Sequence, residues 1–431
     1  MAPATPLERL LQRIVDVRPG EVRVMLLACA YFFCVLSSYY IIRPLREQVG
    51  VAGGVRNIPW LFTATLVAML AVHPPFAALV ARLPRRRFIP WANRFFVANL
   101  AIFFIVFRVM RPEHALWAGR VFFVWTAVFN LFVVSVFWSF MTDVFTSAQG
   151  KRLFGFIGFG GTLGGIVGSI VTASLAQALG PITLLLVSIA LLELSTQSVL
   201  ALGRHMGATA DRRSGDHDAV IGGGTLAGVS HVVSSPYLLG ICTYMVLFTI
   251  GSTTLYLQQA TFADRAYADA GARTAFFAQL DLAVNVLTLL TQVFLTGRIV
   301  KLLGVAITLT LLPALSVIGF ATLGAVPTIA VFVVFQVLRR SGEFAVARPT
   351  REVLYTVLSR EDKYKAKNFI DTFVYRLGDQ IGAWSTAGLA RLGVTAAGEA
   401  LVAVPLSLAW LGVGLWLGRQ QEARSRQRED A

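Results

Sequence analysis

A succession of long apolar blocks limits the folds open to this chain. Residues 97–107 and 182–192 are two examples, and neither contains a charged residue. A helix needs about 20 mostly apolar residues to cross the hydrocarbon of a bilayer, and a soluble domain has no use for repeated segments of this kind. Hydrophobic residues make up 56% of the chain and charged residues 14%, against about 25% charged residues in soluble domains. The alternation of a transmembrane β-barrel is absent. The sequence therefore predicts an all-α membrane protein.

Twelve transmembrane helices are expected from these blocks. The expected spans are residues 22–43, 58–81, 89–109, 115–142, 153–179, 181–202, 236–257, 274–297, 304–325, 327–350, 368–391 and 397–418. The fourth, tenth and eleventh spans contain polar residues and satisfy the apolar criterion least well. We expect helix ends to shift by a few residues, because sequence patterns locate boundaries poorly.

A polar segment divides the chain into two parts of nearly equal size. Residues 204–233 are rich in glycine and polar residues, which is typical of a flexible cytosolic linker. The linker separates an N-terminal six-helix bundle, residues 21–203, from a C-terminal six-helix bundle, residues 234–418. Residues 1–20 place leucines and isoleucine at helical spacing between charges, which favours an amphipathic helix on the cytosolic membrane face or, alternatively, a solvated helical tail. Residues 419–431 are predicted to form a cytosolic tail.

The basic residues are distributed unequally between alternate loops. The formal net charge is +15, and most Lys and Arg outside the spans fall in segments on the same side as the N-terminus. By the positive-inside rule both termini are cytosolic, and the protein is a multi-pass protein of the cell inner (plasma) membrane. Basic loops facing anionic lipid also explain the net charge without a nucleic-acid partner.

An internal repeat is visible at an offset of 214 residues. The offset places four small residues of the fifth span on identical residues of the eleventh: Gly164, Gly168, Thr172 and Ala176 on Gly378, Gly382, Thr386 and Ala390. Small residues four apart allow helix backbones to approach closely in lipid. We therefore expect tight helix contacts near the boundary between two halves that are related by a parallel duplication. Two such six-helix halves resemble the layout of the major facilitator fold.

Ionisable residues inside the spans are candidate functional groups, because burying a charge in a membrane is costly. Arg339, Arg340 and Glu343 lie near the middle of the tenth span, and Arg376 and Asp379 lie in the eleventh. One interpretation is a polar, partly hydrated central cavity that binds a charged solute. The alternative is that these charges pair with one another and only hold helices together.

Three further groups have more than one interpretation. Asp281 and Asn285, one turn apart, make the eighth span polar. Arg43 and Arg46 lie about 20 residues after the beginning of the first span, which is the length needed to cross the hydrocarbon. They therefore either bind solute or extend their charged ends to the outer interface. The loop at 359–365 carries both signs of charge, and its Lys363 and Lys365 are candidates for a gating ion pair.

Enzymatic activity finds no support in the sequence. Motifs of zinc proteases, serine hydrolases and P-loop nucleotide-binding proteins do not occur, and only one histidine, His73, lies within a span. No metal or other cofactor is therefore expected. Since no ATPase domain is recognisable, any transport would be secondary, driven by exchange or by an ion gradient.

Three segments resemble the ATP:ADP antiporter (nucleotide translocase) family of the major facilitator superfamily. They are residues 39–47, which read YYIIRPLRE; residues 137–143, which read FWSFMTD and precede Lys151 and Arg152; and Leu377-Gly378. The resemblance implies a monomeric carrier that exchanges an anionic small molecule, with charged residues of the spans handling nucleotide phosphates. It places Arg46 where the family has a lysine and Asp143 where the family has an acid. Two positions depart from the family: residues 254–258 lack its acid, and Asp379 stands where it has a lysine.

These patterns together predict a secondary transporter of an anionic or zwitterionic metabolite, with nucleotide exchange as the specific hypothesis. A proton-coupled symporter or exporter using Asp281, Asp379 or Glu343 is the first alternative, and a non-transporting membrane scaffold is the second. The predicted substrate-binding residues are Arg43, Arg46, Arg339, Arg340, Glu343, Arg376 and Asp379. The predicted coupling or gating residues are Asp143, Asp281, Asn285, Lys151, Arg152, Lys363 and Lys365.

Overall fold

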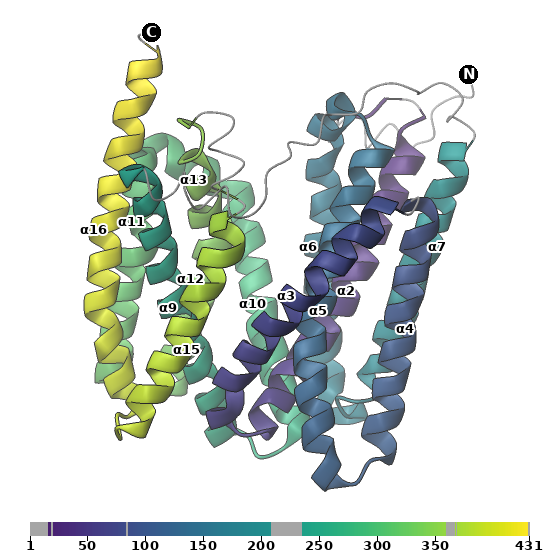
Figure 1. Cartoon of the computed structure of the whole chain (residues 1–431), viewed down its shortest axis with the longest axis horizontal. Helices are drawn as coiled ribbons and strands as arrows, with labels where there is room; N and C mark the ends of the chain where they lie inside the picture. The colour runs from purple at the N-terminus through teal and green to yellow at the C-terminus, as the bar shows by residue number, and fades with distance from the viewer. Residues whose placement is uncertain are drawn as a thin grey trace. The chain divides into compact units, whose positions relative to one another are not determined.

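The computed structural model describes residues 16–18, 20–82, 85–207, 235–358, 367 and 369–429, and all regular structure in them is helical (Figure 1). In chain order the helices are α2 (Val22–Ala52), η1 (Val55–Asn57), α3 (Ile58–Arg82), α4 (Arg85–Val109), α5 (Pro112–Val144), α6 (Ser147–Leu179), α7 (Leu184–Gly207), α9 (Pro236–Ala266), α10 (Ala270–Phe294), α11 (Thr296–Ala325), α12 (Ile329–Gly342), η3 (Glu343–Ala347), α13 (Arg348–Val353), η4 (Ile370–Val374), α15 (Tyr375–Arg391) and α16 (Ala396–Glu429). Each predicted span coincides with a helix or a run of helices. Most of the predicted amphipathic segment and most of the predicted linker lie outside the described residues.

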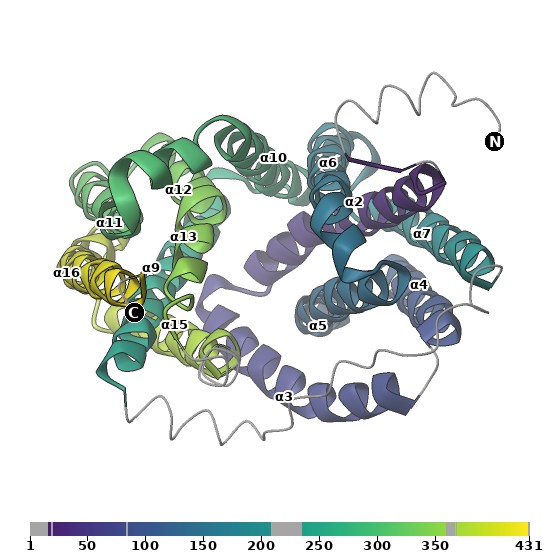
Figure 2. The same ribbon diagram turned by 90° about the horizontal axis from the view of Figure 1, so that it is seen from above.

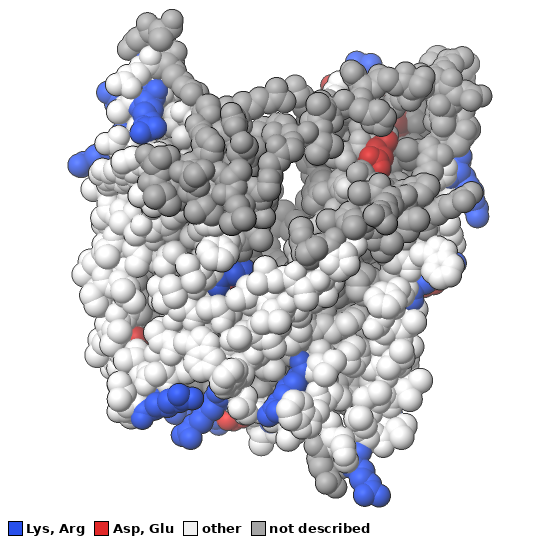
Figure 3. All heavy atoms as spheres, in the orientation of Figure 1, with Lys and Arg blue, Asp and Glu red and all other residues white. Residues whose placement is uncertain are grey.

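Ten of the described helices are long and apolar enough to cross a membrane. The tenth and eleventh predicted spans are not among them; both contain several charged residues, and each includes a π-helical turn, η3 in one and η4 at the beginning of the other. Large apolar side chains are exposed on the outside of the helices, among them Trp91 at 79% and Ile318 at 65%. On the face drawn in Figure 3, the residues that are not grey are mostly white, which marks uncharged residues. A soluble protein rarely exposes so much apolar surface, so this is a multi-pass membrane protein.

The chain packs as two compact units. Unit 1 comprises Met1–Gly53, Ala64–His217 and Tyr267–Leu282, and unit 2 comprises Gly54–Thr63, Asp218–Ala266 and Ala283–Ala431. These ranges differ from the predicted bundles at two short stretches, the beginning of α3 and the beginning of α10, which each belong to the other unit. Hydrogen bonds explain the first: Thr63 donates to Gln380 Oε1 at 2.8 Å and accepts from Trp384 Nε1 at 3.2 Å.

Each unit is organised around its first long helix. In unit 1, α2 packs against α5, α6 and α7, and in unit 2, α9 packs against α15 and α16 (Figure 2). The core of unit 1 is aromatic: the Phe32 ring on α2 stacks on Phe137 of α5 at 4.0 Å between centroids, beside the fully buried Tyr31. Stacked and edge-on aromatic pairs add to the stabilisation that burial provides.

Glycines make the predicted close contacts between helices. A Cβ atom on Gly164 of α6 would lie 2.3 Å from the carbonyl oxygen of Phe33 on α2. In unit 2, a Cβ atom on Gly378 of α15 would lie 1.8 Å from Thr249 Oγ1 on α9. The tight contacts are therefore confirmed. In both cases the partner is the first long helix of the same unit.

Replacement of Gly164 by alanine is expected to destabilise the protein by about 1–3 kcal/mol or more, because the new methyl group meets a backbone atom that cannot rotate away. Gly158 on the same helix is the matched control, since a Cβ there has no neighbour within 4 Å. The control substitution is expected to be neutral or to stabilise the helix by up to about 1 kcal/mol. Thermal unfolding of both variants in detergent tests this, and equal midpoints would contradict the packing described here.

Candidate functional site

Arg339 is the most deeply buried charged side chain of unit 2, with 2% of its surface exposed. Its guanidinium donates hydrogen bonds to Ser316 Oγ, Ser252 Oγ and the carbonyl oxygen of Phe248, each at 3.2 Å. The guanidinium carbon also lies 5.4 Å from the centroid of the Phe248 ring. Among the described residues no carboxylate lies within ion-pair distance of Arg339. Its hydrogen-bond acceptors are therefore all neutral, while the Phe248 ring, the Trp410 ring at 5.9 Å and the more distant charge of Glu343 also act on it.

Glu343 pairs with a residue that sequence analysis did not select. Its Oε1 atom lies 3.1 Å from Arg351 Nη1, and both residues are 8% exposed. This ion pair adds Arg351 to the predicted cluster of Arg339, Arg340 and Glu343. The Arg351 guanidinium lies 5.5 Å from the same Phe248 ring, so two buried arginines lie beside this aromatic side chain.

The π-helical turn η3 explains why the spacing was missed. Glu343 and Arg351 are eight residues apart, which in a regular α-helix would place them about 80° apart around the axis. A π-helical turn includes one additional residue, so the eighth residue occupies roughly the position that the seventh would have in an α-helix. The pair therefore lies on one face, a relation that regular helical spacing hides.

A second charged group of unit 2 lies on α15. Asp379 is 7% exposed, accepts a hydrogen bond from Thr253 Oγ1 at 3.1 Å, and lies 3.4 Å from Arg376 Nη1. Thr253 of α9 follows directly after Ser252, which holds Arg339. Because neighbouring residues of a helix point about 100° apart, α9 holds a buried cation and a buried anion on different faces. Arg340 also belongs to this unit and is partly exposed.

The ion pair of Arg43 and Asp281 is the principal charged contact of unit 1. Arg43 Nη1 lies 3.2 Å from Asp281 Oδ1, and the side chains are 21% and 4% exposed. The predicted end of the first span at residue 43 is wrong, since α2 continues to Ala52. Arg43 pairs with a carboxylate of α10, and both interpretations of Arg43, solute binding and an interfacial position, stay predictions.

Arg46 makes a different set of contacts from Arg43. Its Nε donates to the carbonyl oxygen of Phe123 on α5 at 3.2 Å, and its guanidinium carbon lies 3.9 Å from the Phe123 ring centroid. Its Nη1 also lies 3.3 Å from Glu47 Oε1, and Glu47 is 6% exposed. Arg46 is thus integrated into the packing of α2 against α5.

The remaining predicted coupling residues are dispersed. Asn285 lies one turn after Asp281 on α10, and its Nδ2 atom is buried without a hydrogen-bond partner in the described part of the chain. Asp143 is exposed near the end of α5. Lys151 lies in the first turns of α6, but its side chain is not described. Lys363 and Lys365 fall outside the described residues.

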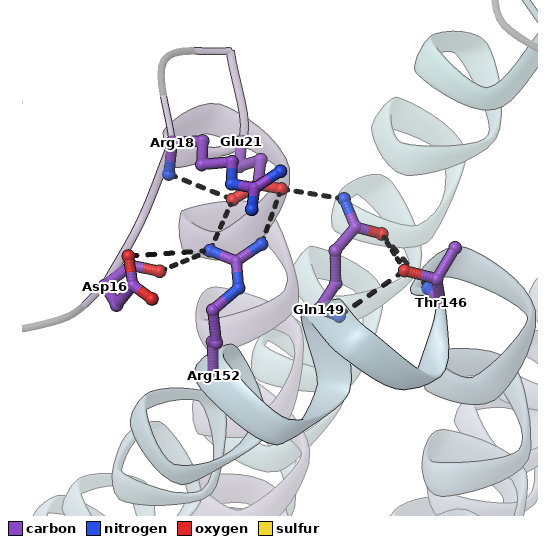
Figure 4. Close-up of polar contacts among 6 residues, drawn as sticks. All are labelled: Asp16, Arg18, Glu21, Thr146, Gln149 and Arg152. Carbon is purple, nitrogen blue, oxygen red and sulfur yellow. Dashed lines mark hydrogen bonds and ion pairs between the residues drawn. The ribbon is translucent and has the colours of Figure 1, made fainter.

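Arg152 organises a polar network at one end of unit 1 (Figure 4). Its Nη2 lies 3.1 Å from Glu21 Oε1, and its Nη1 also contacts the backbone oxygen of Asp16. Glu21 accepts a further hydrogen bond from Gln149 Nε2 at 2.9 Å. Burial by itself would raise the pKa of Glu21, but the hydrogen bonds from Arg152, Gln149 and the Arg18 backbone lower this pKa to about 2. The network joins the beginnings of α2 and α6.

The low pKa of Glu21 gives a pH-dependent prediction. The ordinary value is 4.5 and the folded value is about 2, so the carboxylate stabilises the fold above about pH 4.5, and this contribution is lost as the pH falls through about 2. The unfolding midpoint of Glu21→Gln should lie below that of the unaltered protein by a constant amount from pH 8 to pH 5. The difference should shrink only below that range. A difference that disappears between pH 8 and pH 5 would contradict the network.

Comparisons with known proteins were made for the sequence and for the structure. No protein-family model matches the chain. The sequence is 20% identical over 461 residues to ADP,ATP carrier protein 1 of Chlamydia muridarum (strain MoPn / Nigg), covering 89% of this chain and 85% of that carrier. It is 23% identical over 223 residues to ADP,ATP carrier protein 2 of Chlamydia pneumoniae, which covers 45% of this chain and only 41% of the length of that carrier.

Solved structures with the same fold are transporters. A bacterial homologue of the iron transporter ferroportin in the inward-facing state has a TM-score of 0.64 at 12% identity, covering 92% of this chain and 100% of that one. An auto-inhibited peptide transporter of the POT family has a TM-score of 0.61 at 16% identity, covering 94% and 97%. A mutant of the nucleoside transporter NupG has a TM-score of 0.56 at 13% identity, covering 94% and 99%.

The fold and the sequence lead to two statements of different scope. The chain is an all-helical, multi-pass membrane protein with the fold of major facilitator-type transporters. Within that class, its sequence is distantly similar to the ADP,ATP carriers of Chlamydia.

Proposed function

We propose that this chain is a secondary transporter that moves an anionic metabolite by alternating access, with exchange of nucleotides of the ATP/ADP type as the specific reaction. The observation that carries the proposal is Arg339, a buried cation whose described partners are all neutral. A charge buried within a membrane protein is costly unless it serves a function. An anionic solute that approaches Arg339 would supply the missing negative charge.

The charge balance around Phe248 supports an anionic rather than a cationic substrate. Arg339 and Arg351 place two positive charges within 5.5 Å of the Phe248 ring centroid, and Glu343 forms its ion pair with Arg351 alone. Arg376 and Asp379 balance one another. We propose Arg339, Arg340, Glu343, Arg376 and Asp379 as substrate-binding residues of unit 2, with Arg351 added to them. Arg43 and Arg46 are proposed for unit 1, and Asp281, Asn285, Asp143, Lys151, Arg152, Lys363 and Lys365 for coupling or gating.

The proposed arrangement is twelve spans in two parallel-related halves, with both termini in the cytoplasm of a cell with an inner membrane. The repeated glycine contacts support it. Gly164 and Gly168 lie against Phe33 and Ser37 of α2, and the corresponding Gly378 and Gly382 lie against Thr249 and Ile250 of α9. The same positions of the repeat therefore make the same kind of contact with the first long helix of each unit. Membership of the ATP:ADP antiporter family is part of the proposal.

Proton coupling is the second candidate, and Asp379 favours it. Its carboxylate is buried, yet its partners are one hydroxyl and an arginine whose side chain is 35% exposed. A carboxylate with these few contacts could exchange a proton when Arg376 moves away. A scaffold without transport activity is the third candidate, in which the charged pairs only join helices.

Transport by the purified full chain in proteoliposomes separates the three candidates. Vesicles loaded with unlabelled ATP are given labelled ADP, with and without a pH gradient. Nucleotide exchange predicts uptake that requires internal nucleotide and ignores the gradient. Uptake that depends on the pH gradient and does not depend on internal nucleotide would favour proton coupling. The absence of nucleotide flux under both conditions would overturn the proposed exchange.

A further inference from the structure

A sharp corner joins α10 to α11 within unit 2. Leu295 alone separates the end of α10 at Phe294 from the beginning of α11 at Thr296. A second break follows at Gly304, whose φ of +70° is a conformation that L side chains rarely adopt. Residues 296–303 are therefore a helical segment bounded by two kinks, and we call residues 293–303 the corner segment.

The corner segment exposes large apolar side chains next to basic ones. Leu302 is 80% exposed, Val293 63% and Phe294 60%. Arg298 and Lys301 lie among them and are also exposed. An exposed apolar surface with adjacent cations is typical of segments that lie at the boundary between lipid headgroups and acyl chains.

The end of α16 adds cations to the same region. Gly418 packs against Ala306, where a Cβ atom would lie 2.2 Å from Ala306 Cα, and Glu422 Oε1 accepts a hydrogen bond from Ala306 N–H at 3.0 Å. These contacts hold α16 beside the second kink of the corner segment. Helix α16 continues to Glu429, and its last turns extend past its neighbours (Figure 1). The predicted tail is therefore helical as far as it is described, and it carries the exposed Arg419 and Arg426.

The charge of this surface comes from four exposed cations. Within the described ranges, Arg298, Lys301, Arg419 and Arg426 form no ion pair with a carboxylate. Glu422 lies three residues after Arg419 and four before Arg426, and one of its oxygens accepts a hydrogen bond from Ala306 N–H. The surface formed by the corner segment and the end of α16 is therefore both apolar and positively charged.

Hydrogen bonds also fix the corner segment in place. Pro349 has no N–H, so it cannot donate to Phe344 O in the π-helical register or to Ala345 O in the α-helical register. Side chains at the corner satisfy both oxygens instead: Gln292 Nε2 donates to Phe344 O at 3.2 Å, and Thr296 Oγ1 donates to Ala345 O at 2.8 Å. Hydrogen bonds to η3 therefore hold the corner segment within unit 2.

We propose that the corner segment and the end of α16 form a binding surface for anionic phospholipid. The apolar side chains would contact acyl chains, while Arg298, Lys301, Arg419 and Arg426 bind the negatively charged headgroups. Charge complementarity selects this occupant, since a neutral lipid would leave the four cations without counter-charge. This inference requires only that the protein is embedded in a membrane, and it is independent of the substrate.

Thermal unfolding in mixed micelles tests the proposal. The full chain is purified in neutral detergent with phosphatidylcholine, and phosphatidylglycerol is added stepwise while the unfolding midpoint is recorded. We expect the midpoint to rise and then saturate. In the double variant Arg298→Gln/Lys301→Gln, the fraction of phosphatidylglycerol needed for half of the rise should increase at least about tenfold, since each basic residue near an anionic surface contributes about fivefold in affinity.

A matched variant and a soluble anion complete the experiment. Arg265→Gln/Arg391→Gln removes two exposed cations from the ends of α9 and α15, away from the corner segment, and should respond as the unaltered protein does. Soluble glycerol phosphate at millimolar concentration should not reproduce the rise. An equal loss of response in the two variants, or no response to phosphatidylglycerol in the unaltered protein, would overturn the proposal. A full response to glycerol phosphate would also overturn it, because the surface would then bind free phosphate.

Discussion

Replacement of Arg339 by methionine is expected to abolish transport without destabilising the protein. Methionine has a similar length and fills the same space, but it removes a buried positive charge that has no described carboxylate partner. Removing such a charge also removes its desolvation penalty, which is on the order of several kcal/mol for a buried ion. Of the acceptors left behind, the Ser316 hydroxyl already donates to Leu312 O at 2.9 Å.

The two measurements on this variant distinguish a functional from a structural arginine. Exchange of labelled nucleotide in proteoliposomes should fall by at least about 100-fold, which corresponds to losing about 2.7 kcal/mol of interaction with the substrate. The thermal midpoint should remain equal or rise. A variant that transports normally would remove Arg339 from the site, and one that unfolds well below the unaltered protein would indicate that Arg339 only joins helices. Arg391→Gln, at an exposed position, serves as the control for expression and reconstitution.

The Asp281→Leu variant is expected to lose about 2–4 kcal/mol of stability, and a second substitution should restore most of it. Removing one member of a buried ion pair leaves the other charge uncompensated, whereas replacing both members is often neutral. Asp281 is nearly inaccessible and Arg43 is 21% exposed, so the loss should lie below that of a completely buried pair. The double variant Arg43→Leu/Asp281→Leu should therefore be more stable than Asp281→Leu alone.

Denaturant titrations of the two single variants and the double variant give the interaction energy as a double-mutant cycle. Additive losses would show that Arg43 and Asp281 do not interact in the folded protein. Transport by the double variant supplies a separate result. If the pair only anchors the beginning of α10 in unit 1, exchange should survive in the double variant, whereas a coupling role of Asp281 predicts that exchange is lost although stability is recovered.

The positions of the helices were predictable from sequence because hydrophobic blocks of about 20 residues have no other stable arrangement in lipid. The end of α2 was not predictable in this way, because the expected span was ended at the first charged residues, on the assumption that they mark the membrane boundary. Arg43 and Arg46 instead find partners on other helices, and Glu47 pairs with Arg46, while the helix continues to Ala52. A pattern along one chain does not reveal such partners.

The candidate site was predicted in part for a related reason. Arg339 was selected by its depth in the tenth span, and its burial agrees with that choice. Arg351 and the hydroxyls of Ser252 and Thr253 were missed, because a serine or threonine in a span is common and Arg351 is out of helical phase with Glu343. The sequence signal that could have identified Arg351 is Pro349, whose missing N–H favours an irregular turn just before it.

The π-helical turn at Glu343–Ala347 makes this part of the chain adjustable by one residue. Its defining hydrogen bond runs from Arg348 N–H to Glu343 O, and a shift of this bond to the next oxygen would convert the turn into α-helix. Everything that follows would then rotate by about 100° about the helix axis. Such a rotation would carry the guanidinium of Arg351 away from the Glu343 carboxylate and break their ion pair.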